Sequence, residues 1–173
     1  MKFACSMIFL GLFASATFAQ DAPIVRWKQI VGVITAPGMD NPVAMATDAQ
    51  GQASAIHAGA GPWSAVSGYA RVDLINSSVS FNVTGLVMNG GNNSGLVPAN
   101  FKVVGTLVCN SGTTDVATAK DTPPVLLSPQ GDADFTGQFT TSIPPSCANP
   151  LFLIRVPTGR WIATGAVRTQ SAQ

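Results

Sequence analysis

The chain has 173 residues, a formal net charge of +1 and only 10% charged residues, and it contains no Glu. This balance argues against nucleic acid or an anionic membrane surface as a partner, because both are bound by a clustered positive field. Glu and Lys are common formers of exposed helices, whereas Val, Thr, Ile and Phe are spread throughout the chain. The composition therefore favours β structure.

The first residues have the layout of a secretory signal peptide. Lys2 is followed by an apolar stretch from about residue 3 to residue 13 and then by small residues up to Ala19. This order predicts a signal peptide over residues 1–19, with cleavage between Ala19 and Gln20. The rival interpretation is a retained membrane anchor, although the apolar run is short for a spanning helix. We expect a secreted or periplasmic protein with no integral membrane span after cleavage.

The remaining residues, 20–173, suit a single all-β domain. They contain two cysteines, Cys109 and Cys147. In an exported protein an even pair of cysteines predicts a disulfide, and the alternative is two free buried thiols. Two Cys and one His are too few ligands for a recognised zinc spacing, so we predict no metal site and no cofactor.

Alternation of apolar and polar residues predicts the strands. It is clearest from residue 70 to 74 and from 79 to 83, on either side of the polar turn Asn76-Ser77-Ser78, which indicates a β-hairpin. The segment 101–109 repeats the pattern, with Cys109 on its apolar side. That side should face the core, where a disulfide can bridge two elements.

Further strands are expected over 24–36, as one strand or two short ones, and over 125–127, 133–139, 151–156 and 161–168. The total of about eight strands, separated by turn signals, predicts an antiparallel β-sandwich, with barrel-like closure as a variant. The alanine-rich segment 44–58 has the composition for one turn or a short helix, and 89–100 and 110–122 read as surface loops. An eight-stranded outer-membrane barrel has about this length, but the single Tyr and three Trp are few for its aromatic girdles.

The segment 55–64, AIHAGAGPWS, holds the only His of the chain, His57, and one of its three Trp, Trp63. His57 has the chemistry of a general base, yet the sequence supplies neither a nucleophile motif nor an orienting carboxylate beside it. Trp63 follows the turn residues Gly61-Pro62, so its face is a candidate surface for a sugar ring or a hydrophobic partner. The alternative is that Trp63 folds back and caps the open end of the sandwich. Trp63 and His57 are the candidate ligand-binding residues.

Asp132 and Asp134 lie two residues apart at the start of a predicted strand, so both project from the same face. Paired carboxylates are the machinery of glycoside hydrolysis and also attract Ca²⁺. Their surroundings, Gln130-Gly131-Asp132-Ala133-Asp134, read instead as a solvated turn. We assign neither residue a catalytic role.

Two segments carry a resemblance. The residues 104–109, VGTLVC, and the chain end from Phe152-Leu153-Ile154-Arg155 to Gly165-Ala166-Val167-Arg168 resemble a group of small secreted bacterial all-β proteins to which no function has been assigned. More distantly, the strand SVSFNVTGL and the terminal hairpin are similar to the CHRD-type extracellular β domain. The paired histidines of that domain are absent, because His57 stands alone. The resemblance implies export and an all-β body, and no catalytic residue.

The sequence thus predicts a secreted, non-enzymatic β-sandwich with a binding role or a structural role in the envelope or matrix. Its expected partner is an extracellular glycan or protein. The alternative is an extracellular hydrolase that acts on glycans or esters and uses His57 or the pair Asp132 and Asp134. The two hypotheses differ in space, because an enzyme gathers such groups in one concave pocket.

Overall fold

The computed structural model describes residues 24–35, 45–47, 53–59, 61–111, 117–157 and 159–170, and the predicted signal peptide lies outside this set. The described residues form β-strands and one 3-10 helix, and none of their helices is long and apolar enough to cross a membrane. The elements are β1 (Ile24–Gly32), β2 (Met45–Thr47), β3 (Ala53–Ala55), β4 (Trp63–Ser64), β5 (Ser67–Asp73), β6 (Ser78–Thr84), β7 (Val87–Met88), η1 (Gly91–Asn93), β8 (Lys102–Cys109), β9 (Ala117–Asp121), β10 (Val125–Leu126), β11 (Ala133–Gln138), β12 (Leu151–Arg155) and β13 (Trp161–Gln170).

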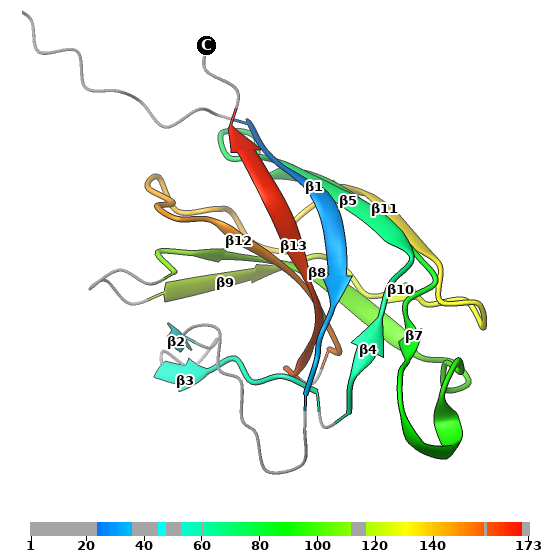
Figure 1. Ribbon diagram of the computed structural model, residues 1–173. Helices are drawn as coiled ribbons and strands as arrows, with labels where there is room; N and C mark the ends of the chain where they lie inside the picture. Colours follow the sequence, from blue (N-terminus) through cyan, green and yellow to red (C-terminus); the bar gives the residue numbers. More distant parts are fainter. Residues whose placement is uncertain are drawn as a thin grey trace, which may run out of the picture.

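Eight antiparallel strands form one curled sheet in the order β11-β6-β5-β1-β13-β12-β8-β9 (Figure 1). The sheet continues from β9 into β2 and β3, β10 pairs with β8, and β4 and β7 make a separate two-stranded sheet. The curl brings the end of β11 back toward β9, where Thr140 N donates to Asp121 O at 2.8 Å. The predicted all-β fold of about eight antiparallel strands is therefore confirmed, with partial closure of the barrel.

Large aromatic side chains fill the inside of the curl. Trp27 and Phe81 both contact Phe152, with ring centroids 5.6 Å and 5.7 Å apart, and all three side chains are at most 2% exposed. Gly105 of β8 lies under these rings, because a Cβ atom there would be 2.6 Å from the Phe81 ring. The glycine lets β8 approach the aromatic core, which a side chain at this position would push apart.

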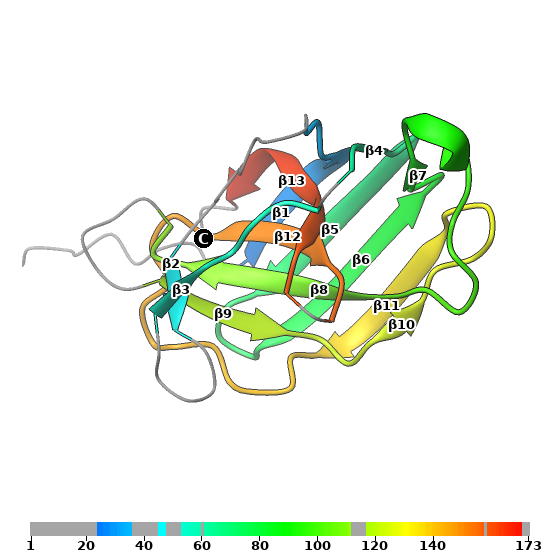
Figure 2. The same cartoon turned by 90° about the horizontal axis from the view of Figure 1, so that it is seen from below.

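The strand β8 is buried on both of its faces. Every residue from 103 to 109 is buried, although only alternate residues point into the curl. On the opposite face Thr106 and Val108 of β8 and Leu153 of β12 are all 0% exposed. Figures 1 and 2 show the segment with β2 and β3 on this outer side of the sheet. Ile56, which follows β3, belongs to the same apolar cluster as Val108 and Leu153.

The part of the sheet around β8 and β12 is covered on both faces, and we call it the covered half. Its polar groups are mostly paired. Thr106 Oγ1 donates to Asp121 Oδ1 at 2.6 Å, and Thr122 Oγ1 accepts from Gly105 N at 3.0 Å. Arg155 adds a cation, with Nη1 4.0 Å from Asp121 Oδ1. Pairing of this kind allows the threonines to be buried at little cost.

Two expectations about irregular segments need correction. The alanine-rich segment 44–58 contains β2 and β3 among its described residues, and not a helical turn. The second predicted loop, 110–122, contains β9, which pairs with β8. The first predicted loop, 89–100, is an exposed loop that contains the short 3-10 turn η1. In each strand the partner supplied by the fold overrides a weak local preference.

Candidate functional site

The strand β1 is kinked at Lys28. Trp27 and Ile30 are both buried, while Lys28 and Gln29 between them are both exposed, so the alternation of the strand shifts there by one residue. The pairing register with β13 skips Lys28 and the residue that would lie opposite, Val167. Val167 has a φ of 52°, a left-handed conformation that is strained for a β-branched side chain.

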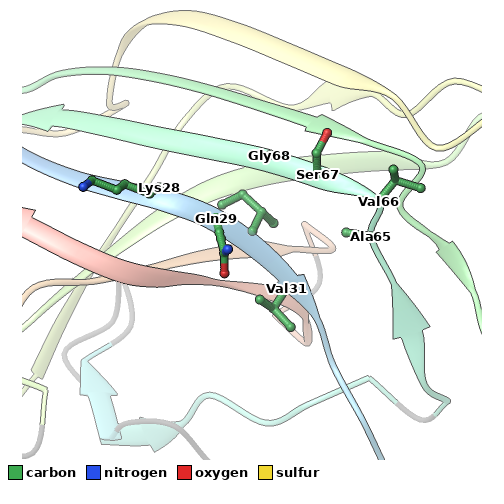
Figure 3. A pocket seen from close by; sticks show the side chains of 8 residues that line it. Lys28, Gln29, Val31, Ala65, Val66, Ser67 and Gly68 are labelled. Atoms are coloured by element: carbon green, nitrogen blue, oxygen red, sulfur yellow. The ribbon is translucent and has the colours of Figure 1, made fainter.

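The kink separates β1 from β5. Their pairing ends where Trp27 lies opposite Ala70. Beyond that point the two strands border an open cleft of about 310 Å³, which is at the small end of the range for ligand pockets. The buried side chain of Ile30 belongs to its lining, and Gly68 lies directly over it, because a Cβ at Gly68 would be 2.7 Å from Ile30 Cγ1. The lining residues are Lys28, Gln29, Ile30, Val31, Ala65, Val66, Ser67 and Gly68 (Figure 3).

An exposed tyrosine stands beside this cleft. Tyr69 is the only Tyr of the chain and is 51% exposed. It points away from the core because its neighbour Ala70 is buried. The next strands continue the outer face with polar side chains: Asn82 lies opposite Tyr69, and Asp134 lies opposite Asn82. Tyr69 is thus an aromatic side chain within a polar sheet face.

Cations lie next to Tyr69 on the same outer face. Arg71 follows it by two residues, and Arg26 of β1 lies directly opposite Arg71. Lys28, on the rim of the cleft, would lie opposite Tyr69 if the pairing of β1 and β5 continued by one residue. Like charges on directly opposite residues oppose pairing, so this positive charge does not help the sheet to form.

Asp73 marks the far end of this group on β5. Its Oδ1 accepts hydrogen bonds from the backbone N–H groups of Ile75 and Asn76, and its Oδ2 accepts one from Asn76 Nδ2. These bonds, first of all the one from the Asn76 backbone, lower the pKa of Asp73, and the charge of Arg71 adds to the effect. Asp73 is therefore held as a carboxylate by the turn after β5.

Trp63 is buried, as expected if its side chain folds back as a cap. The side chain is 6% exposed and its ring stacks on Phe101, with centroids 5.4 Å apart. The backbone N–H of Trp63 donates to Val33 O at 2.8 Å, which joins β4 to the end of β1. The ring is covered by protein, in agreement with the alternative of a cap, and its predicted ligand role is not carried forward.

His57 lies between β3 and β4, and Trp161 N donates to its carbonyl oxygen at 2.9 Å. The adjacent Ala58 forms an isolated bridge to Trp161 at the start of β13. His57 therefore belongs to the segment that covers the outer side of the sheet. Neither His57 nor Trp63 lines the cleft between β1 and β5.

Asp132 and Asp134 are both exposed, on the turn before β11 and on β11 itself. Asp132 Oδ1 accepts a hydrogen bond from Gly85 N at 3.0 Å, and its own N–H donates to Ser128 Oγ at 3.0 Å. These bonds match the interpretation of a turn. His57 is hydrogen-bonded to Trp161, the first residue of β13. Three strands, β6, β5 and β1, separate β13 from β11 in the sheet, so His57 and the two acids belong to different parts of the sheet. Within the described ranges, no group of three or more His, Cys, Asp or Glu side chains has an arrangement that could hold a metal ion.

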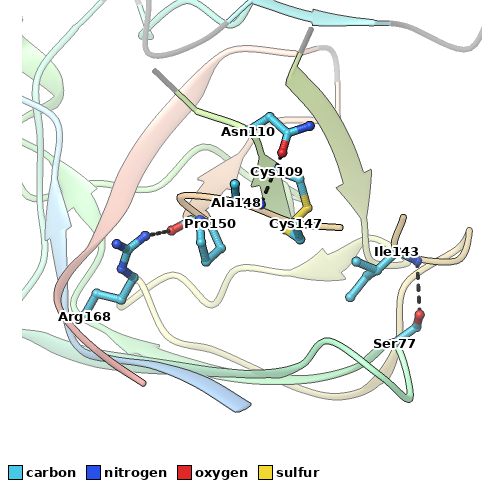
Figure 4. The surroundings of a disulfide bond; sticks show 8 residues. All are labelled: Ser77, Cys109, Asn110, Ile143, Cys147, Ala148, Pro150 and Arg168. Carbon is cyan, nitrogen blue, oxygen red and sulfur yellow. Dashed lines mark hydrogen bonds between the residues drawn. A yellow bond between two sulfur atoms is a disulfide. The ribbon is translucent and has the colours of Figure 1, made fainter. Parts of the chain in front are cut away.

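The predicted disulfide is present. Cys109, at the end of β8, is bonded to Cys147, and their Cα atoms are 4.7 Å apart (Figure 4). Asn110 and Ala148 reinforce the link, because Asn110 N donates to Ala148 O at 2.6 Å and Ala148 N donates to Asn110 Oδ1 at 3.2 Å. The bond joins β8 to the segment that leads from β11 to β12.

The exposed residues of the site, Lys28, Tyr69 and Arg71, were missed by the sequence analysis. Alternation already indicated that Tyr69 and Arg71 point away from the core, because Ala70 and Val72 point inward. No local pattern in the sequence indicated the cleft itself. Comparisons of the chain with protein-family models, with curated proteins and with solved structures found no match to any of them.

Proposed function

We propose that the chain is an exported, non-enzymatic binding domain whose ligand is an extracellular glycan, bound on the outer face of β5 and β1. The observation that carries the proposal is the exposure of Tyr69, at 51%, beside a cleft of about 310 Å³. The predicted signal peptide and the disulfide support a secreted or periplasmic location, where disulfides persist.

The position of Tyr69 supports binding more than stability. A half-exposed aromatic side chain on a polar sheet face gains little from burial in the free protein. A tyrosine ring offers an apolar surface and a hydroxyl to a ligand at a small cost in conformational entropy, and aromatic residues are enriched in binding surfaces. The strand β5 is paired with β6 along its whole length, so the ring is presented by a rigid element.

The cleft adds the polar groups that a sugar requires. Lys28, Gln29 and Ser67 supply an ammonium group, an amide and a hydroxyl, and Val31 and Val66 supply apolar surface. Val31 is 44% exposed and Val66 is 82% exposed, so both are accessible. This mixture suits a ligand that has hydroxyl groups on its edges and apolar ring faces. No observation favours the hydrolase alternative. Asp132 accepts a hydrogen bond that stabilises the turn before β11, and His57 lies next to the start of β13, away from that turn.

A glycan-array screen tests the proposal. Wild-type protein, purified from an export host with its disulfide formed, is compared with Tyr69→Ala. Loss of a central aromatic contact should weaken binding by about tenfold or more. The matched control is Leu126→Ala, which removes an apolar side chain that is 57% exposed on β10, outside the proposed face. Equal signals from wild type and Tyr69→Ala, or no glycan bound by the wild type, would contradict the proposal.

A further inference from the structure

We infer that the glycan is an acidic polysaccharide, in which a carboxylate or sulfate group contacts Arg71 and Lys28 while a sugar ring lies on Tyr69. This inference rests on the proposed function and names its ligand class. It starts from the outer face of β1 and β5, where three cations, Arg26, Lys28 and Arg71, occupy neighbouring positions in a chain whose formal net charge is only +1.

The positions of the cations follow from the register. Arg71 lies two residues after Tyr69 on the same strand, and both point outward because Ala70 and Val72 are buried. Lys28 lies on the other side of Tyr69, on the rim of the cleft. A ring on Tyr69 therefore has a guanidinium group along the strand and an ammonium group across the cleft.

The carboxylates of this face lie at its borders. Asp73 follows Arg71 at the end of β5, where both of its oxygens accept hydrogen bonds from the turn. Asp134 is on β11, separated from Tyr69 by Asn82 of β6. The pKa of Asp73 is lowered first of all by the hydrogen bond from the Asn76 backbone and least by the charge of Arg71, so Asp73 offsets only part of that charge. Between these two acids, the charged side chains among the described residues of β1 and β5 are all cations: Arg26, Lys28 and Arg71.

An acidic ligand fits this arrangement chemically. A guanidinium group offers a planar pair of N–H donors to a carboxylate or sulfate, and an ammonium group offers a point charge. Neutral glycans would use Tyr69 and the amide of Gln29 and leave the cations unused. Arg26 and Arg71 are like-charged neighbours, and an anion bound over them would reduce their mutual repulsion.

The test uses polygalacturonate, alginate, hyaluronate and heparin as acidic polymers, with dextran and methyl-esterified polygalacturonate as neutral ones. Affinities are measured by titration calorimetry at several salt concentrations. We expect at least one acidic polymer to bind about tenfold tighter than both neutral polymers, and the affinity to fall as salt rises. Arg71→Gln and Lys28→Gln should each weaken that binding severalfold.

Lys102→Gln is the matched control, because it removes one positive charge from an exposed residue of β8, outside this face. Equal losses in Arg71→Gln and Lys102→Gln would mean attraction by net charge alone and would overturn the inference. Binding to none of the acidic polymers would also overturn it. If acidic and neutral polymers bind equally and Tyr69→Ala still weakens both, the ligand class is wrong while the proposed function stands.

Discussion

The two halves of the curled sheet differ in what lies on their outer side. On β8 and β12 the outward residues Thr106, Val108 and Leu153 are completely buried. On β5 and β6 the outward residues are polar and accessible, and Tyr69 is half exposed. A strand covered on both sides forms a continuous apolar run, as in VVGTLVC, whereas a strand covered on one side alternates, as in SVSFNVT. The covered half buries apolar side chains on both faces, and the open half leaves one face exposed, which is the face that we propose for ligand binding.

The disulfide ties the halves together, and its loss should have the largest effect on stability. Cys109 ends a strand of the covered half, and Cys147 follows β11 of the open half. For a sequence separation of 38 residues, we expect the double variant Cys109→Ala/Cys147→Ala to lose roughly 3 to 4 kcal/mol of unfolding free energy. Calorimetry checks the loss as a fall in Tm of about 10 °C. Unreduced peptide mass spectra that contain free thiols in freshly exported protein would refute the expectation.

Matched truncations on the two outer faces test the contrast directly. Leu153→Ala removes a fully buried side chain from the covered face, and we expect it to cost about 3 kcal/mol. Thr136→Ala removes an exposed side chain from the outer face of β11, and its effect should stay within about 0.5 kcal/mol. Denaturation in urea measures both. Similar losses in the two variants would mean that the outer side of β12 is not covered in solution.

A smaller effect is expected at the kink that opens the cleft. Val167→Gly relieves a left-handed conformation, and after the entropy cost of glycine we expect the unfolding free energy to rise by up to about 1 kcal/mol. Val31→Gly, on the strand paired with β13 and without a positive φ, is the control and should lower it by a similar amount. The same urea experiment measures both changes. A loss of stability in Val167→Gly would contradict the expected relief of strain.

Strict alternation made the open half predictable from sequence. The hairpin of β5 and β6 was expected within a few residues because one face of each strand is apolar, and Cys109 was placed on the inward side for the same reason. The strand β9 was missed because its residues ATAKD have little β propensity and it exists through its pairing with β8. The short strands β2 and β3 were missed for a similar reason.

The candidate site was much less predictable. Its cleft depends on the match between Lys28 near the start of the chain and Val167 near its end, which no local pattern reveals. Its cations were hidden in a total charge near zero, because the register alone places Arg26 opposite Arg71. The sequence pointed instead to Trp63, whose ring is packed on Phe101 in the structure.

The pairing of β1 with β13 sets the order of events in folding. β1, the first described strand, lies between β5 and β13, the last described strand, so a fragment that lacks β13 cannot complete the curl. One edge of β1 therefore stays unpaired until β13 has been synthesised. Such distant pairing predicts folding over milliseconds to seconds, and only once β13 is available to pair.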